Sequence, residues 1–96
     1  MRLLDIFKSR KPVISEAERR NFLQSKGRIA DGTIIESETL ETGEEIVFYY
    51  YNVQGMDFES SEILTAEQCK NRLKYAPGAK IGVRFDPKNH GNSMLV

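Results

Sequence analysis

The sequence predicts an α+β domain, mainly β, built on a small five-stranded antiparallel curved sheet or barrel. Three observations predict this class. From residue 28 onward, apolar residues recur with a period of two, which is typical of strands. Turn residues separate these runs, as in successive hairpins. A helix-capping signature lies between the third and fourth runs, so one helix interrupts the strands.

Residues 1–27 are expected to form a helical extension that packs on the domain. The first ten residues contain an apolar stripe among charged side chains, as on a short amphipathic helix. The stripe consists of Leu3, Leu4, Ile6 and Phe7. Because isolated helices shorter than about 12 to 15 residues are marginal in water, this segment needs a surface to lie on.

A second helix is expected over about residues 16–26. Ser15 and Glu18 have the spacing of a capping box, and Gly27 follows as a left-handed stop. This helix presents Phe22 and Leu23, which we expect to cover one face of the sheet together with the apolar stripe of the first ten residues.

Residues 28–96 are expected to form a small β-barrel-like domain. Strands are expected over residues 29–39, 45–53, 56–64, 80–85 and 93–96. Asp31-Gly32 predicts a bulge in the first strand, Gln54-Gly55 predicts a tight turn, and residues 86–92 predict a turn-rich loop in which the Asp86 carboxylate accepts backbone N–H bonds.

The helix between the third and fourth strands is expected to begin after Thr65 and to run for about ten residues. Ala66, Cys69 and Leu73 recur with helical spacing and form one narrow apolar stripe. The element order βββαββ is also that of the five-stranded oligonucleotide/oligosaccharide-binding barrel.

Two groups of residues in the barrel domain have a distinctive spacing. The first is the series Tyr49, Tyr51, Val53, Gly55 and Phe58, and the second is the run from Pro77 to Asn89, which contains Val83-Arg84-Phe85-Asp86-Pro87. Together they resemble a small bacterial β-domain family of unknown function whose members often lie beside transmembrane helices. The resemblance covers about residues 28–96 and implies a compact β-barrel-like module without known catalysis. The chain differs from the pattern in having Phe85 where tyrosine is commoner and His90 where proline often follows Asn89.

Charge is distributed unevenly although the net charge is zero. Residues 1–27 carry seven Lys and Arg against three Asp and Glu, residues 28–66 carry one against nine, and residues 67–96 carry six against two. Clustered Lys and Arg supply most nonspecific affinity for nucleic acid, so the acidic middle segment opposes nucleic-acid binding.

The tyrosine-rich strand over residues 45–53 is apolar on both faces. Alternation places Val47, Tyr49, Tyr51 and Val53 on one face, which we expect to fill the barrel with Ile81, Val83 and Phe85. Ile46, Phe48 and Tyr50 lie on the other face. That second face is either covered by the N-terminal helices, exposed as a protein or self-association surface, or used as a stacking site for a ligand.

No residue pattern indicates catalysis or a cofactor. Cys69 is expected on a helix stripe, where cysteine is usually an inert packing residue, and His90 lies in a loop. The loop after Asp86 resembles a calcium loop, but Lys88 stands where an oxygen ligand is needed. We expect no enzymatic activity, no cofactor and no metal.

The function expected from these features is non-enzymatic binding of a protein partner, or self-association, through Ile46, Phe48 and Tyr50. Leu4 and Phe7 are expected to act as a lid or anchor. The alternative is a barrel that binds a small ligand or an oligosaccharide. We expect a cytoplasmic protein, with weak attachment of residues 1–11 to an anionic membrane surface as a further alternative.

Overall fold

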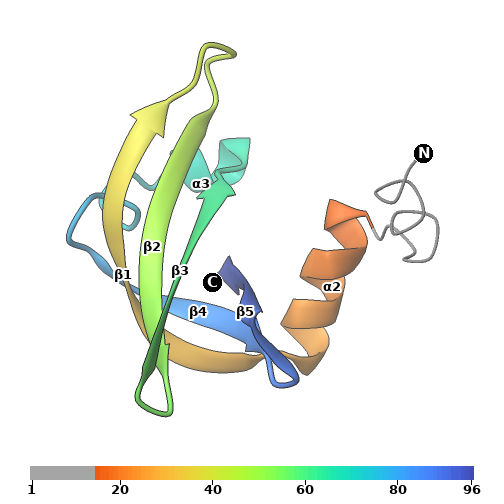
Figure 1. Ribbon diagram of the computed structural model, residues 1–96. Helices are drawn as coiled ribbons and strands as arrows, with labels where there is room; N and C mark the ends of the chain where they lie inside the picture. The colour runs from red at the N-terminus through yellow and green to blue at the C-terminus, as the bar shows by residue number, and fades with distance from the viewer. Residues whose placement is uncertain (1–14) are drawn as a thin grey trace, which may run out of the picture.

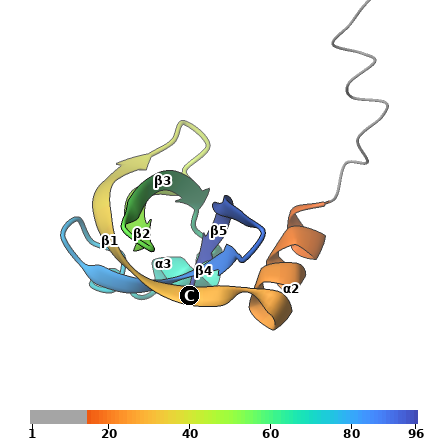
Figure 2. The same cartoon turned by 60° about the horizontal axis from the view of Figure 1, so that its bottom comes forward.

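Five antiparallel strands form one strongly curved sheet in the order β3-β2-β1-β4-β5. The strands are β1 (Arg28–Thr39), β2 (Glu45–Val53), β3 (Met56–Ile63), β4 (Lys80–Asp86) and β5 (Asn89–Leu95). The computed structural model describes residues 15–96, and Figure 1 shows the arrangement of their elements. The sheet curls until β3 and β5 face one another, so it nearly closes into a barrel (Figure 2). The predicted fold class is confirmed.

The β2–β3 hairpin sets the register of the tyrosine-rich strand. Gln54 and Gly55 both have positive φ, at 53° and 86°, as a two-residue turn of the twisted hairpin type requires. Val53 therefore pairs with Met56, and the pairing runs back along both strands to Ile46 and Ile63. The expected turn and the expected bounds of β2 are both confirmed.

β1 pairs with two strands, because its first half lies against β4 and its second half against β2. The predicted bulge at Asp31-Gly32 is wrong, since both residues pair regularly. The register shift lies instead between Ile34 and Glu36. Gly32 lies where a side chain has no room, since a Cβ there would lie 2.6 Å from Val83 Cγ2 and 3.0 Å from the Tyr50 carbonyl oxygen.

The barrel interior is filled by side chains from all five strands and from the segment that follows α3. The predicted inner face of β2 is confirmed: Tyr49 and Tyr51 are fully buried, and Tyr51 stacks against Phe58 and Phe85 with ring centroids 5.6 and 6.4 Å apart. The buried core consists of Ile34, Val47, Tyr49, Tyr51, Val53, Leu64, Tyr75, Ile81, Val83, Phe85 and Leu95.

The helix α2 (Glu16–Lys26) begins with the predicted capping box. The Ser15 hydroxyl accepts the Glu18 N–H at 3.1 Å, and the Glu18 carboxylate accepts the Ser15 N–H at the same distance. Gly27 is not the predicted left-handed stop, because its φ is −74° and the chain passes directly into β1. A side chain is excluded there for another reason: a Cβ would lie 2.4 Å from the Leu23 carbonyl oxygen.

The helix α2 packs beside β4 and β5 (Figure 2). Leu23 is fully buried, whereas Phe22 is exposed. Arg19 fastens the helix to β5, since its guanidinium donates to the Asn92 side-chain oxygen at 3.0 Å and to the Ser93 carbonyl at 2.7 Å. The expectation that Phe22 and Leu23 cover the second face of β2 is therefore wrong. Leu3, Leu4, Ile6 and Phe7 lie outside the described residues.

The helix α3 (Ala66–Cys69) is shorter than the predicted ten residues. The predicted stripe is wrong, because Cys69 is exposed and Leu73 is 86% exposed. Turns replace the rest of the helix, and two backbone hydrogen bonds join them to β1, from the Gly78 N–H to the Ile34 carbonyl and from the Ile34 N–H to the Ala79 carbonyl. This attachment turns Tyr75 into the core. We call residues 66–79 the cap.

The fifth strand begins earlier than predicted, at Asn89 rather than residue 93. The expected loop over residues 86–92 is a tight hairpin instead, in which Asp86 pairs with Asn89. The Asp86 carboxylate accepts the Lys88 N–H at 2.8 Å, as predicted. This side-chain bond holds the turn and lets β5 start at once.

Candidate functional site

The predicted binding residues Ile46, Phe48 and Tyr50 lie together on the outside of the barrel. The structure adds two isoleucines that the sequence reasoning missed: Ile63, which pairs with Ile46 across β2 and β3, and Ile35, which lies at the register shift of β1. Tyr50, Ile35 and Ile63 are 40%, 43% and 41% exposed. We call these five residues the outer β2 face. Leu4 and Phe7, the expected lid, lie outside the described residues.

Carboxylates border the outer β2 face. Glu38 pairs with Ile46 and Glu36 with Phe48 on the β1 side, and Glu59 pairs with Tyr50 on the β3 side. All three glutamates are exposed. The outer β2 face is thus an apolar centre with an acidic border, and a binding partner of complementary chemistry has apolar side chains flanked by Lys or Arg.

The inner tyrosines of β2 serve the barrel core. The Tyr49 hydroxyl lies 2.7 Å from Ser93 Oγ on β5, and the Tyr51 hydroxyl donates to the His90 carbonyl. Burial raises the pKa of both tyrosines above the ordinary value. Because these rings are buried, they offer no stacking surface.

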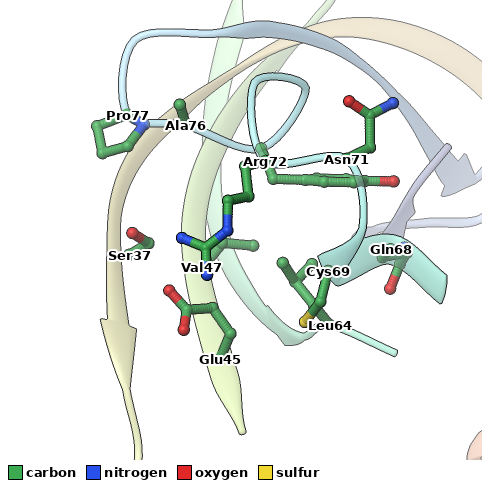
Figure 3. Close-up of a pocket in the computed structure, with 11 residues that line it drawn as sticks. Ser37, Glu45, Val47, Leu64, Gln68, Cys69, Asn71, Arg72, Ala76 and Pro77 are labelled. Carbon is green, nitrogen blue, oxygen red and sulfur yellow. The ribbon is translucent and has the colours of Figure 1, made fainter. Parts of the chain in front are cut away.

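A cavity of about 230 Å³ lies where the cap meets the ends of β1 and β2 (Figure 3). Apolar side chains line its inner part, chiefly Val47, Leu64 and Tyr75. Figure 3 shows the Arg72 guanidinium and the Glu45 carboxylate pointing toward one another in this space. We call it the cap cavity. Its remaining lining residues are Ser37, Gln68, Cys69, Asn71, Ala76 and Pro77.

Sequence reasoning missed the cap cavity because it placed residues 66–75 in a regular helix. The cap leaves helical geometry after Cys69. In the turns that follow, the Tyr75 side chain is buried in the core and the Leu73 side chain is exposed to solvent. The Pro77-Gly78 pair was a signal of a break, but it gives no position for Arg72.

Cys69 and His90 line different cavities. Cys69 lines the cap cavity, whereas His90 lines a more open cavity of about 560 Å³ near the turns at Gln54 and Pro87. The His90 ring packs edge-on against Phe58 and Phe85, with centroids 6.0 and 5.3 Å apart. The structure does not bring the two residues together as a nucleophile and its base.

Within residues 15–96, no group of three or more His, Cys, Asp or Glu side chains has an arrangement that would hold a metal ion. In the same range, neither helix has the length and apolar character needed to cross a membrane.

Comparisons with protein-family models, with curated proteins and with solved structures found no match for this chain. The resemblance to the small bacterial β-domain family therefore stays a prediction.

Proposed function

We propose that this chain is a non-enzymatic interaction module that binds a protein partner through the outer β2 face. The observation that carries the proposal is the exposure of Tyr50 on β2, Ile35 on β1 and Ile63 on β3, around the half-buried side chains of Ile46 and Phe48 on three neighbouring strands. A strand that has one face in solvent normally alternates apolar and polar residues. Apolar residues along the solvent face therefore indicate a binding surface.

The acidic border supports a partner with basic and apolar side chains. Such a segment is present in this chain: residues 1–11 contain Leu4 and Phe7 among Arg2, Lys8, Arg10 and Lys11. A second copy of the chain is therefore the first partner to test. In that arrangement Leu4 and Phe7 anchor on the apolar centre, and the basic residues face the glutamates of the border.

Sedimentation velocity over a range of protein concentrations tests this proposal with two matched variants. Tyr50→Lys places a charge in the apolar centre of the outer β2 face. Ile29→Lys places the same charge at an exposed apolar residue of β1 that lies outside this face. We expect the native chain to self-associate and Tyr50→Lys to weaken the association by about tenfold or more, as for a central interface residue. Ile29→Lys should leave it unchanged.

Salt and the N-terminal anchor provide two further controls. Raising the salt concentration should weaken association, because exposed charges are screened. The double variant Leu4→Ala/Phe7→Ala should weaken it as Tyr50→Lys does. If Tyr50→Lys and Ile29→Lys weaken association equally, the outer β2 face is not the contact. A native chain that stays monomeric at every concentration excludes the second copy as partner.

Ligand binding in the barrel is the second candidate function, and the observation that favours it is the cap cavity. It combines an apolar interior with charged groups at its opening, as small-molecule sites do. Thermal shifts with a ligand library test this function on the full chain, since a ligand that binds the folded state raises the melting temperature.

A further inference from the structure

The structure assigns a ligand class to the cap cavity: we propose that it binds a free α-amino acid with an apolar side chain. This inference rests on the second candidate function and is independent of the outer β2 face. Three features of the cavity carry it, namely its size, its apolar interior and the two opposite charges at its opening.

Size limits the ligand to a small metabolite. A volume of about 230 Å³ equals that of roughly eight water molecules in the liquid, at about 30 Å³ each, so the ligand has on the order of ten non-hydrogen atoms. Sites for drug-sized ligands are larger, about 300 to 1,000 Å³. An oligosaccharide is too large for this space.

The interior selects an apolar group. Val47, Leu64 and Tyr75 are buried core residues whose surfaces also line the cavity. The cap has one helical turn and directs Leu73 to solvent, so this leucine does not fill the space. An aliphatic or aromatic side chain of the ligand would cover this apolar surface and remove it from water.

The opening selects a molecule with both charges. Arg72 and Glu45 point into the cavity, and within residues 15–96 the Arg72 guanidinium has no hydrogen bond or ion pair. The Glu45 carboxylate accepts a hydrogen bond from the Thr39 hydroxyl at 2.9 Å, which holds it in place. A simple anion would be repelled by Glu45 and a simple cation by Arg72. An amino acid avoids both penalties, because its carboxylate pairs with Arg72 and its ammonium with Glu45.

A direct Arg72–Glu45 contact is the competing state of the empty cavity. Exposed ion pairs contribute little to stability, so a ligand that supplies one partner to each charge displaces such a contact easily. The ligand also covers the apolar surface of the cavity, which stays exposed to water when Arg72 and Glu45 form a direct ion pair.

Cys69 provides a local readout in the full-length protein. It is the one cysteine of the sequence, it is exposed, and it lines the cavity. The experiment measures the rate at which iodoacetamide alkylates Cys69 with increasing L-leucine, and compares N-acetyl-L-leucine, L-leucinamide and glycine. These three compounds lack the ammonium, the carboxylate and the apolar side chain respectively.

L-Leucine should slow alkylation in a saturable manner, and the three analogues should do so at least tenfold less effectively. Arg72→Gln and Glu45→Gln should each raise the leucine concentration for half-protection by about tenfold or more. Lys70→Gln is the matched control, since Lys70 lies on the cap and does not line the cavity. It should leave protection unchanged, as should Tyr50→Lys. Circular dichroism of each variant checks that the fold is retained.

Three results would overturn the inference. The first is unchanged alkylation at about 10 mM leucine, ten times a millimolar dissociation constant. The second is equal protection of Cys69 by leucine, N-acetyl-L-leucine and L-leucinamide. That result would keep a ligand site in the cavity but would show that it does not recognise both charges of a free amino acid. The third is protection that Arg72→Gln and Lys70→Gln reduce equally. Failure of leucine together with thermal shifts by other compounds would reject the ligand class and keep the second candidate function.

Discussion

The Glu62 carboxylate on β3 accepts a hydrogen bond from the Leu95 backbone N–H on β5, with 3.0 Å between Oε1 and N. β3 and β5 are the two edges of the sheet, so this side chain joins them where the strand order ends. The other carboxylate oxygen lies 3.4 Å from Arg20 Nη2 and from Gln68 Nε2. One buried carboxylate thus connects both sheet edges with α2 and α3.

Substitution of Glu62 should open the barrel seam. Glu62→Ala leaves the buried Leu95 N–H without an acceptor and removes one of the two carboxylates that pair with Arg20, so we expect it to lower the free energy of unfolding by about 2 to 4 kcal/mol. Glu62→Gln keeps an acceptor oxygen, so its free energy of unfolding should fall by about half as much as that of Glu62→Ala. Urea unfolding measures both values.

Glu59→Ala is the control for Glu62, because Glu59 lies on the same strand and is exposed. It should change the free energy of unfolding by less than about 0.5 kcal/mol. Equal losses in Glu62→Ala and Glu59→Ala would show that the seam bond contributes nothing.

Stability should fall at alkaline pH because of Tyr49. Burial raises the pKa of its hydroxyl above the ordinary value of about 10. As pH rises through about 10, the unfolded chain releases this proton while the folded chain keeps it, so the free energy of unfolding falls. The stabilisation is complete below this pH and is lost as pH approaches the raised pKa. Urea unfolding from pH 8 to pH 11 measures the slope.

Tyr49→Phe removes this titration and is the test of its origin. The variant loses the Ser93 hydrogen bond and should be about 1 kcal/mol less stable at pH 7. Its free energy of unfolding should nevertheless decline less steeply above pH 10 than that of the native chain. Parallel curves for the two proteins would assign the decline to other groups.

The bounds and the register of the strands could be predicted closely where a two-residue turn joins them. The Gln54-Gly55 turn gives the β2–β3 register by counting, so the pairing of Ile46 with Ile63 could have been found from the sequence. Ile34-Ile35 is a second readable signal, because two adjacent apolar residues interrupt an alternating strand where the register shifts.

The contacts of helices could not be predicted in the same way. The apolar side chains Phe22 and Leu23 indicate a buried face of α2, but no local signal says which strands it meets, and Arg19 decides this through β5. Residues 66–75 have a helical pattern that tertiary hydrogen bonds to Ile34 override. The cap cavity depends on this departure from a regular helix, so it could not be predicted from the sequence.

Arg19 should control the attachment of α2 to the barrel. Arg19→Ala removes the bonds to Asn92 and Ser93, so we expect faster amide hydrogen exchange along α2 and a loss of about 1 to 2 kcal/mol in the free energy of unfolding. Lys26→Ala is the control, since Lys26 is exposed in the same helix. If exchange along α2 is the same in both variants, the Arg19 bonds do not hold the helix on the barrel.

Gly32 should be the least replaceable glycine of the sheet. In Gly32→Ala the new Cβ meets Val83 Cγ2 at 2.6 Å and the Tyr50 carbonyl oxygen at 3.0 Å, one in the core and one on the neighbouring backbone. Overpacking of this kind costs about 1 to 3 kcal/mol of stability, because neither neighbour can move freely. Gly91→Ala is the matched control, since a Cβ there meets its first neighbour, Asn89 Oδ1, at 3.8 Å. Thermal unfolding should show a clear loss for Gly32→Ala and little change for Gly91→Ala, and equal melting temperatures would mean that β1 can shift away from β4 without loss of packing.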